Sequence, residues 1–308
     1  MKTRIIGTGS ALPETIVTND ALSEVVDTND EWIRSRTGIG TRRIAKTETT
    51  DQLAAAAAAK ALENAATAAE EIELILVASS SAENVFPNIA SMVQEQLHAV
   101  NAVCYDISAA CSGFLAALHT ADAFIRAGIY KKAIVVGAEK MSKLLDWKDR
   151  STCVLFGDGA GAVVVAADTE TGIAHTVFCS DGAKGDVLTC RSDGNISMDG
   201  QAVFKFAVKK VPEAIEILLQ QCGKQNSDIK YYILHQANVR IIQSVARRLQ
   251  IDESKFPMNL EQYGNTSAAS IPILLDECNR RGDFCKGDQL VLSGFGAGLS
   301  WGAMLLAW

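Results

Sequence analysis

The 308-residue chain has few prolines and histidines, five and four respectively, and it lacks any long run of apolar side chains. A membrane-spanning helix needs about 18 consecutive apolar residues, and no stretch of the sequence approaches this length. The apolar start within residues 1–10 is too short for a signal peptide. The formal net charge of −7 argues against general nucleic-acid binding. We therefore expect a soluble, cytoplasmic protein that binds neither membranes nor nucleic acid.

The cysteines and histidines also lack the spacing that is typical of metal sites. The eight cysteines include no Cys-x-x-Cys pair, and the four histidines stand far apart. We expect reduced thiols, no structural metal and no resident cofactor. What the chain does have is 48% apolar residues, enough to bury one large core or two medium ones.

Two halves of the sequence match at a constant offset of 157 residues. Residues 72–77, for example, correspond in type to residues 229–234. Each half has the pattern strand, helix, strand, helix, strand, which predicts a duplicated α/β fold with a mostly parallel sheet. We place the division between residues 1–168 and residues 169–308. Chance similarity between two α/β halves is the alternative.

Cys111 is the most informative single residue. It stands between a short apolar strand at residues 103–107 and an apolar helical pattern that begins at Phe114. Backbone N–H groups and the helix dipole at a helix start favour the thiolate, which is the nucleophilic form of cysteine. The sequence therefore predicts a thiol of lowered pKa and acyl-thioester chemistry. A small buried thiol without a chemical role is the alternative.

Two further polar residues stand where α/β sheets place their chemistry. His235 follows an apolar strand at residues 231–234, and ligand sites in such sheets gather beyond the carboxyl ends of strands. Asn265 lies in a segment of small polar residues, 263–270, just before a helical pattern. The alternatives are a structural histidine and a turn or capping asparagine.

Taken together, five motifs resemble the β-ketoacyl-acyl-carrier-protein synthase III family of thiolase-like condensing enzymes. They are Asp-Ile-Ser-Ala-Ala-Cys-Ser-Gly-Phe at 106–114, Phe-Gly-Asp-Gly-Ala-Gly at 156–161, His-Gln-Ala-Asn at 235–238, Gly-Asn-Thr-Ser-Ala-Ala-Ser at 264–270 and Phe-Gly-Ala-Gly-Leu-Ser-Trp-Gly at 295–302. The resemblance spans the whole chain. It implies thiolase-like duplicated βαβαβ halves that form a layered α-β-α-β-α sandwich.

The resemblance also implies an activity, which is the decarboxylative Claisen condensation that initiates fatty acid biosynthesis. Cys111 would take an acyl group from acyl-CoA, and malonyl-acyl-carrier protein would then be decarboxylated with help from His235 and Asn265. The backbone N–H groups of Cys111 and Ala297 would form the oxyanion hole. The family has glycine at the latter position, so the alanine Cβ narrows the space and adds strain if φ must be positive.

Family positions for binding are carried over one by one. The CoA and acyl-chain set comprises Trp32, Arg36, Phe86, Arg150, Met198, Gly200, Phe204 and Asn238. The carrier-protein set comprises Gln236, Ala237, Asn238, Val239, Arg240, Lys209, Lys210 and Arg247. Residues 205–248 hold eight basic and three acidic side chains, which makes the segment locally basic, although a solvated helix face is the usual meaning of such charges. The family further implies a homodimer.

Other functions remain open at this stage. A related condensing enzyme could prime a polyketide or quinolone pathway. Cysteine hydrolases of the papain type share the chain order Cys, His, Asn, but Cys111 lacks their local sequence context. A non-catalytic carrier-docking protein is a further alternative. The acyl primer cannot be named, because acyl groups that differ by a few methylenes differ little in binding energy.

Overall fold

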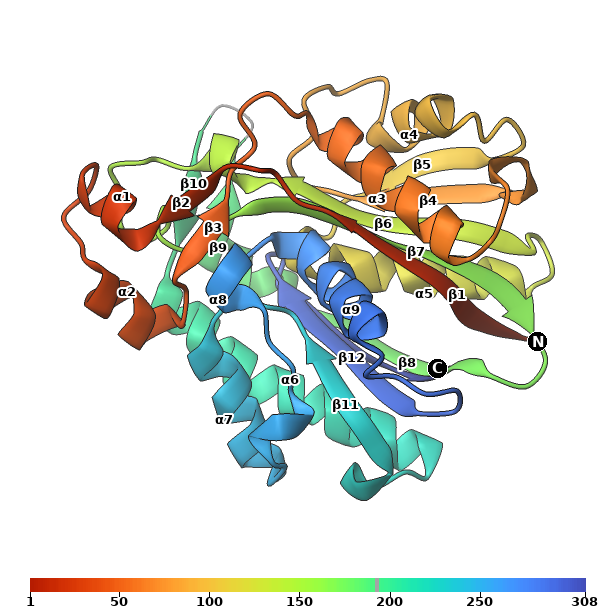
Figure 1. Cartoon of the computed structure of the whole chain (residues 1–308). Coiled ribbons are helices and arrows are strands. Elements are labelled where there is room, and N and C mark those ends of the chain that lie inside the picture. The colour runs from red at the N-terminus through yellow and green to blue at the C-terminus, as the bar shows by residue number, and fades with distance from the viewer. Residues whose placement is uncertain (192–193) are drawn as a thin grey trace.

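The computed structural model describes residues 1–191 and 194–308, whose strands form two main sheets (Figure 1). The first sheet draws its strands from the first half of the chain. In spatial order they are β1 (Lys2–Ala11), β7 (Asp158–Asp168), β6 (Lys132–Lys140), β4 (Leu74–Ala78) and β5 (Val103–Ile107). The pairs β6–β4 and β4–β5 are parallel, while β1–β7 and β7–β6 are antiparallel.

The second sheet draws its strands from the second half. Its order is β11 (Ile229–Leu234), β12 (Gln289–Gly296), β13 (Ser300–Ala307) and β8 (Gly172–Ser180). Only β11–β12 is a parallel pair in this sheet. The prediction of a mostly parallel sheet is therefore wrong. Three residues connect β12 to β13, and so short a loop joins only antiparallel strands.

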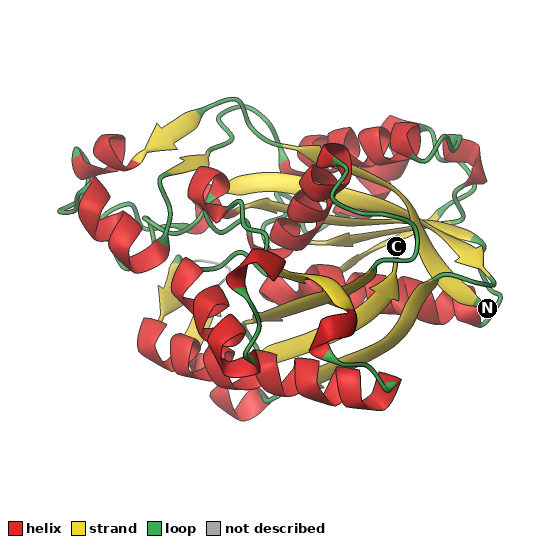
Figure 2. Cartoon of the chain, turned by 60° about the horizontal axis from the view of Figure 1, so that its bottom comes forward, coloured by secondary structure: helices red, strands yellow, loops and turns green. Residues whose placement is uncertain are grey.

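Helices cover both sheets and fill the space between them (Figure 1; Figure 2). The outer layers are α3 (Thr50–Asn64) with α4 (Ile89–Leu97), and α6 (Gly200–Cys222) with α7 (Val239–Leu249). The middle layer is α5 (Gly113–Arg126) with α9 (Ser270–Arg281), which packs against strands of both sheets. The fold is thus the expected layered α-β-α-β-α sandwich.

Alanine lets α3 approach its sheet closely. The helix contains six consecutive alanines, and most of them are buried against the strands. A Cβ added at Gly9 of β1 would lie 2.3 Å from the Ala57 carbonyl oxygen. Small side chains on both surfaces therefore set the spacing of this outer layer.

The sequence duplication is visible in the backbone. A 3₁₀ turn at Ala110–Ser112 precedes α5, and a 3₁₀ turn at Ser267–Ala269, 157 residues later, precedes α9. Both turns begin with a left-handed residue, Ala110 at φ 46° and Ser267 at φ 51°. The two middle-layer helices therefore start in the same way. The division at residues 168 and 169 stays a prediction.

Shorter elements gather at one end of the sandwich (Figure 1). They are β2 (Ile16–Thr18), α1 (Asn19–Ser23), α2 (Asp30–Thr37), β3 (Thr41–Arg43), β9 (Leu188–Cys190), β10 (Ile196–Met198) and α8 (Leu260–Tyr263). Further 3₁₀ turns lie at Ala69–Glu71, Met141–Leu144, Gly182–Val187, Asn226–Asp228 and Glu253–Lys255. Among the described residues, no helix combines the length and apolarity that crossing a membrane requires.

Candidate active site

Cys111 lies in the 3₁₀ turn between β5 and α5, where the strand ends and the middle-layer helix begins. The residue is buried, with 8% of its surface exposed. The left-handed Ala110 turns the chain sharply just before it. The thiol therefore stands at a helix start, as the sequence predicts.

The predicted protonation state of Cys111 is wrong. Burial raises the pKa of the thiol to about 12; a hydrogen bond to Ser267 acts in the opposite direction, and the nearby Glu139 carboxylate raises it further. A helix start contributes about 1 kcal/mol in favour of an anion, which is less than one pKa unit. Desolvation is the larger effect, so the resting residue is a thiol.

His235 follows β11 and is buried, with 2% of its surface exposed. Burial lowers its pKa to about 3, so the imidazole is neutral near pH 7. Its Nδ1 lies 2.7 Å from the Ser270 hydroxyl, which accepts the Gln236 backbone N–H at 3.3 Å. The hydroxyl proton is then used best by donating to Nδ1, which leaves the His235 proton on Nε2.

Asn265 is fixed by its backbone and by one side-chain atom. Its N–H donates to the Leu155 carbonyl at 2.8 Å, and its carbonyl accepts the Gly157 N–H at 3.0 Å. The side-chain Oδ1 accepts the Ser267 backbone N–H at 2.8 Å. The amide Nδ2 is consequently the end that is free to donate to a ligand.

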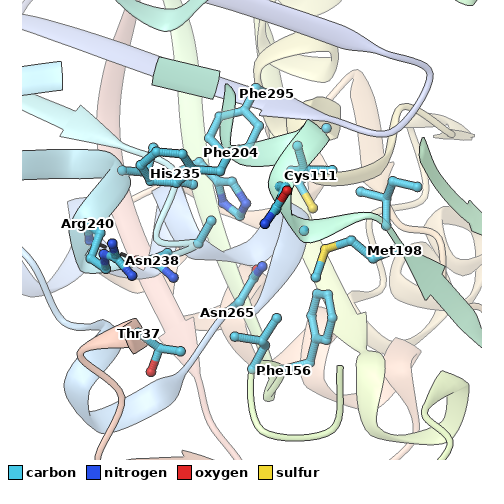
Figure 3. Close-up of a pocket in the computed structure, with 18 of the residues that line it drawn as sticks. Thr37, Cys111, Phe156, Met198, Phe204, His235, Asn238, Arg240, Asn265 and Phe295 are labelled. Carbon is cyan, nitrogen blue, oxygen red and sulfur yellow. Dashed lines mark hydrogen bonds between the residues drawn. The ribbon is translucent and has the colours of Figure 1, made fainter. Parts of the chain in front are cut away.

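One cavity of about 470 Å³ brings these residues together. Cys111, His235 and Asn265 all line it, although they come from three separate segments of the chain. Figure 3 shows the thiol, the imidazole and the amide around a common space, with the amide nitrogen of Asn265 on the side that faces Cys111. The Phe295 ring packs edge-on against His235, with centroids 5.3 Å apart. The arrangement offers one nucleophile and two neutral donors.

The Gly-rich loop after β12 borders the nucleophile. A Cβ added at Gly296 would lie 2.7 Å from the Cys111 nitrogen, so this glycine leaves the backbone N–H accessible. The left-handed φ of the loop, 134°, belongs to Gly298, so Ala297 escapes the backbone strain considered above. The Ser300 hydroxyl donates to the Ala297 carbonyl at 3.2 Å, and its oxygen lies 2.7 Å from that of Ser112. Ala297 as an oxyanion donor stays a prediction.

Comparison with known proteins identifies the family. The family model of 3-oxoacyl-[acyl-carrier-protein] synthase III matches residues 105–182. The model of the C-terminal part of the same family matches residues 219–308. A β-ketoacyl-[acyl-carrier-protein] synthase III from Clostridium acetobutylicum is 48% identical over 99% of this chain and 98% of its own length. The chain belongs to the 3-oxoacyl-[acyl-carrier-protein] synthase III family. It is an acyltransferase of the condensing type, and we call it the synthase below.

Solved structures agree with this assignment. The 3-oxoacyl-[acyl-carrier-protein] synthase III from Aquifex aeolicus VF5 has a TM-score of 0.98 and 46% identity, over 99% of this chain and all of its own. A priming β-ketosynthase from the R1128 polyketide biosynthetic pathway has a TM-score of 0.96 and 36% identity, over 99% of the synthase and 96% of its own length. The thiolase-like fold predicted from sequence is confirmed.

The residues of the predicted adenine clamp lie together, and Arg36 beside them also lines the cavity. Trp32, on α2, has the Arg36 guanidinium 4.9 Å and the Arg150 guanidinium 5.0 Å from its ring centroid. Arg150 also donates to the Asp27 carbonyl at 2.9 Å. An adenine that stacks between Trp32 and Arg150 must therefore displace the guanidinium from the indole.

Most of the predicted tunnel residues line the same cavity as Cys111, His235 and Asn265. Its lining includes Met198, Gly200, Phe204 and Asn238. Asn238 also caps α7 by accepting the Arg240 N–H at 2.8 Å, and it donates to the Arg36 carbonyl at 3.0 Å. Phe86 lies elsewhere, because 84% of its surface is exposed and it does not line this cavity.

The residues predicted to bind the carrier protein differ in exposure and in whether their charge is already paired. Arg240, Arg247 and Lys209 are exposed, while Ala237 and Val239 are half-buried. Lys210 donates to Glu213 at 2.9 Å, so its charge is already paired.

Gln236 is a correction to that set. The side chain is fully buried, and its amide donates to the Leu234 carbonyl at 2.8 Å. Its Oε1 accepts the Asn259 N–H at 3.2 Å. A residue that is enclosed in this way has no surface to offer a partner protein.

Three residues of the site were missed from the sequence. Ser270 orients His235, Ser267 orients Asn265, and Glu139 contacts Ser267. The constant offset of 157 residues could have indicated Ser267, because Ser267 corresponds to Ala110, the residue just before Cys111. That correspondence singles out the second turn as part of the site.

Proposed function

We propose that the synthase condenses an acyl-CoA primer with malonyl-acyl-carrier protein and so initiates fatty acid biosynthesis. The observation that carries the proposal is the common cavity of Cys111, His235 and Asn265. The first residue supplies the nucleophile, and the other two supply donors. The family membership supports the same reaction.

In the first half-reaction, the Cys111 sulfur attacks the acyl-CoA carbonyl. The sulfur–carbon bond to Cys111 forms, the bond to CoA breaks, and the thiol proton ends on the released CoA. The backbone N–H of Cys111, left open by Gly296, can donate to the tetrahedral oxyanion. The raised thiol pKa means that proton loss accompanies attack rather than precedes it.

In the second half-reaction, malonyl-acyl-carrier protein loses CO₂ and leaves an enolate-like thioester oxygen. Nε2–H of His235 and Nδ2–H of Asn265 donate to this oxygen, and the carbanion attacks the acyl group on Cys111. Neither donor needs to accept a proton, which suits an imidazole whose pKa lies at about 3. The Cys111 sulfur leaves and takes up a proton.

The test follows the two half-reactions separately. We expect Cys111→Ser to abolish acyl transfer from acyl-CoA, as read by intact mass, whereas the exposed Cys285→Ser control keeps it. His235→Ala or Asn265→Ala should slow malonyl decarboxylation about 100-fold, yet leave acylation of Cys111 comparatively intact. Acylation of another cysteine in Cys111→Ser, or equal loss of both steps in the donor variants, would refute these roles.

Priming of a polyketide pathway is the second candidate. The similarity to the priming β-ketosynthase favours it, although that identity, 36%, is below the 48% to the Clostridium protein. Decarboxylation assays with a panel of acyl-CoA primers separate the two. A marked preference for primers other than short fatty acyl groups would favour the second candidate.

We further propose that the synthase acts in the cytoplasm as a homodimer. β5 is an edge strand of its sheet, and Val103 on it is 49% exposed. The nearby segment adds Val85 and Phe86, which are 93% and 84% exposed. An unpaired edge flanked by apolar side chains is a surface that a second copy can cover.

A further inference from the structure

The start of α9 holds both proposed donors in place; it comprises the 3₁₀ turn at Ser267–Ala269 and Ser270, the first residue of the helix. The Ser267 backbone N–H donates to Oδ1 of Asn265 at 2.8 Å, and the Ser270 hydroxyl lies 2.7 Å from Nδ1 of His235. The position of this turn therefore determines whether Nδ2 of Asn265 and Nε2 of His235 point into the cavity. Small displacements of such donors lower the reaction rate strongly, because the donors must lie within hydrogen-bond distance of the oxygen on which negative charge develops.

Glu139 lies behind this turn, near the end of β6, and has no exposed surface. Its Oε1 accepts the Ser267 hydroxyl at 2.9 Å, and the Ala268 backbone N–H also bonds to the carboxylate. Its Oε2 accepts the Ser81 hydroxyl at 2.5 Å and the Ser80 N–H at 3.1 Å. Within the described residues, no lysine or arginine forms an ion pair with it. Burial raises the pKa of the Glu139 carboxyl, and the hydrogen bonds from these donors act in the opposite direction. A buried carboxylate surrounded by donors is costly to keep, and it ties β6 firmly to the turn.

The duplication shows what this strand position does. The offset of 157 residues matches Glu139 to Gly296 and Ala268 to Cys111. At α5, Gly296 leaves the Cys111 N–H open to the cavity. At α9, a carboxylate occupies the corresponding space. The N–H groups at the start of α5 are thus open to a substrate oxyanion. The start of α9 is instead hydrogen-bonded to Glu139 inside the protein.

We propose that Glu139 is a positioning residue for the decarboxylation step. Through Ser267 it anchors the 3₁₀ turn at the start of α9, and that turn sets the direction of the Asn265 amide and the His235 imidazole. Glu139 itself does not line the cavity, so it reaches the two donors through the turn, while its charge also raises the pKa of the Cys111 thiol. The inference rests on the proposed role of Asn265 and His235 as enolate donors.

Glu139→Gln tests the inference. The NH₂ group of the glutamine must face either the Ser80 N–H or the Ala268 N–H. A backbone N–H cannot accept a hydrogen bond, so two donors then face each other and one hydrogen bond to the turn or to the Ser80 segment is lost. We expect malonyl decarboxylation to fall about 10- to 100-fold, while acylation of Cys111 stays within about threefold of wild type. A purely structural role would lower both half-reactions together.

Asp158→Asn is the matched control. Asp158 is a fully buried carboxylate on the neighbouring strand β7, and it too is surrounded by donors, from Ala45 at 2.8 Å and from Ser142 at 2.7 and 2.9 Å. Neither of these donor residues belongs to the turn at the start of α9. We expect this variant to lose thermal stability but to keep both half-reactions when assayed while folded.

Ser267→Ala is a second variant that leaves the carboxylate in place. It should slow malonyl decarboxylation as Glu139→Gln does, and it should slow acylation to a smaller extent, because the Ser267 hydroxyl also hydrogen-bonds the Cys111 thiol. In the double variant of Glu139→Gln with Asn265→Ala, the fall in decarboxylation should be smaller than the product of the two single effects, because one of the two donors that Glu139 positions is already gone. A slow Asn265→Ala with normal Glu139→Gln and Ser267→Ala would overturn the inference alone. Normal decarboxylation in Asn265→Ala would overturn both the inference and the donor role on which it rests.

Discussion

Burial decides the chemistry of the two central residues. It raises the pKa of the Cys111 thiol to about 12 and lowers the pKa of the His235 imidazole to about 3. Both effects favour the neutral forms and disfavour the thiolate and imidazolium pair of a cysteine hydrolase. The neutral imidazole is suited to donate from Nε2.

The His235 shift has a consequence for stability. Its folded pKa lies below the usual 6.5, so between about pH 3 and 6.5 the unfolded chain binds a proton that the folded protein does not. Folding stability should therefore fall as the pH falls below 6.5, by about 2 kcal/mol at pH 5 from this residue. Urea unfolding at pH 5 and 7 measures it. His235→Gln should weaken the pH dependence, the exposed His119→Gln should not, and equal slopes in all three proteins would contradict the assignment.

Residue types and spacing were enough to single out Cys111, His235 and Asn265, which share one cavity, because each follows a recognisable strand or precedes a recognisable helix. The protonation state of Cys111 was not predictable. It depends on layers contributed by both halves of the chain, and no local pattern reports that burial. The enclosed Gln236 was misplaced for the same reason, since its cover comes partly from Asn259.

At the scale of elements, the strand predicted at residues 103–107 is confirmed as β5. Parallel pairing was overestimated, because β7 and β13 return antiparallel beside their predecessors. Hydrophobic runs show that a strand is buried but not which way it pairs, since parallel and antiparallel core strands read alike in sequence. The length of the β12–β13 loop was the available signal.

Helix α7 carries the prediction for the carrier protein. Arg240 and Arg247 are exposed on it, and Arg240 lies at the cavity mouth. A small acidic partner would be steered by such charges, so Arg240→Ala should raise the KM for malonyl-acyl-carrier protein severalfold, and salt should raise it in the wild type. Kinetics with acyl-CoA should barely change.

The paired Lys210 supplies the comparison for this experiment. Its ammonium already contacts Glu213, so Lys210→Ala should affect the carrier-protein KM less than Arg240→Ala does. The exposed Lys209→Ala should resemble Arg240→Ala in direction. An unchanged KM in both Arg240→Ala and Lys209→Ala would place docking on another surface.

At the scale of the whole molecule, the exposed edge at β5 predicts how two copies meet. Val103→Glu and Phe86→Glu each put a charge on the surface that we expect a partner to cover, which should shift the protein from dimer to monomer. Light scattering coupled to gel filtration reads the mass directly. Ile217→Glu, on α6 and 44% exposed, should leave the dimer intact. A wild-type protein that runs as a monomer would contradict the proposal.

The neutral, enclosed His235 also bears on how long the acylated protein lasts between its two substrates. Hydrolysis of an acyl-cysteine needs a base that takes a proton from water, and an imidazole with a pKa of about 3 is a poor one. In the proposed mechanism, the thioester on Cys111 would therefore be protected from hydrolysis by the lack of a base as well as by its burial. The protein can hold its primer as a waiting intermediate, and the arrival of the second substrate, rather than leakage to solvent, ends the wait.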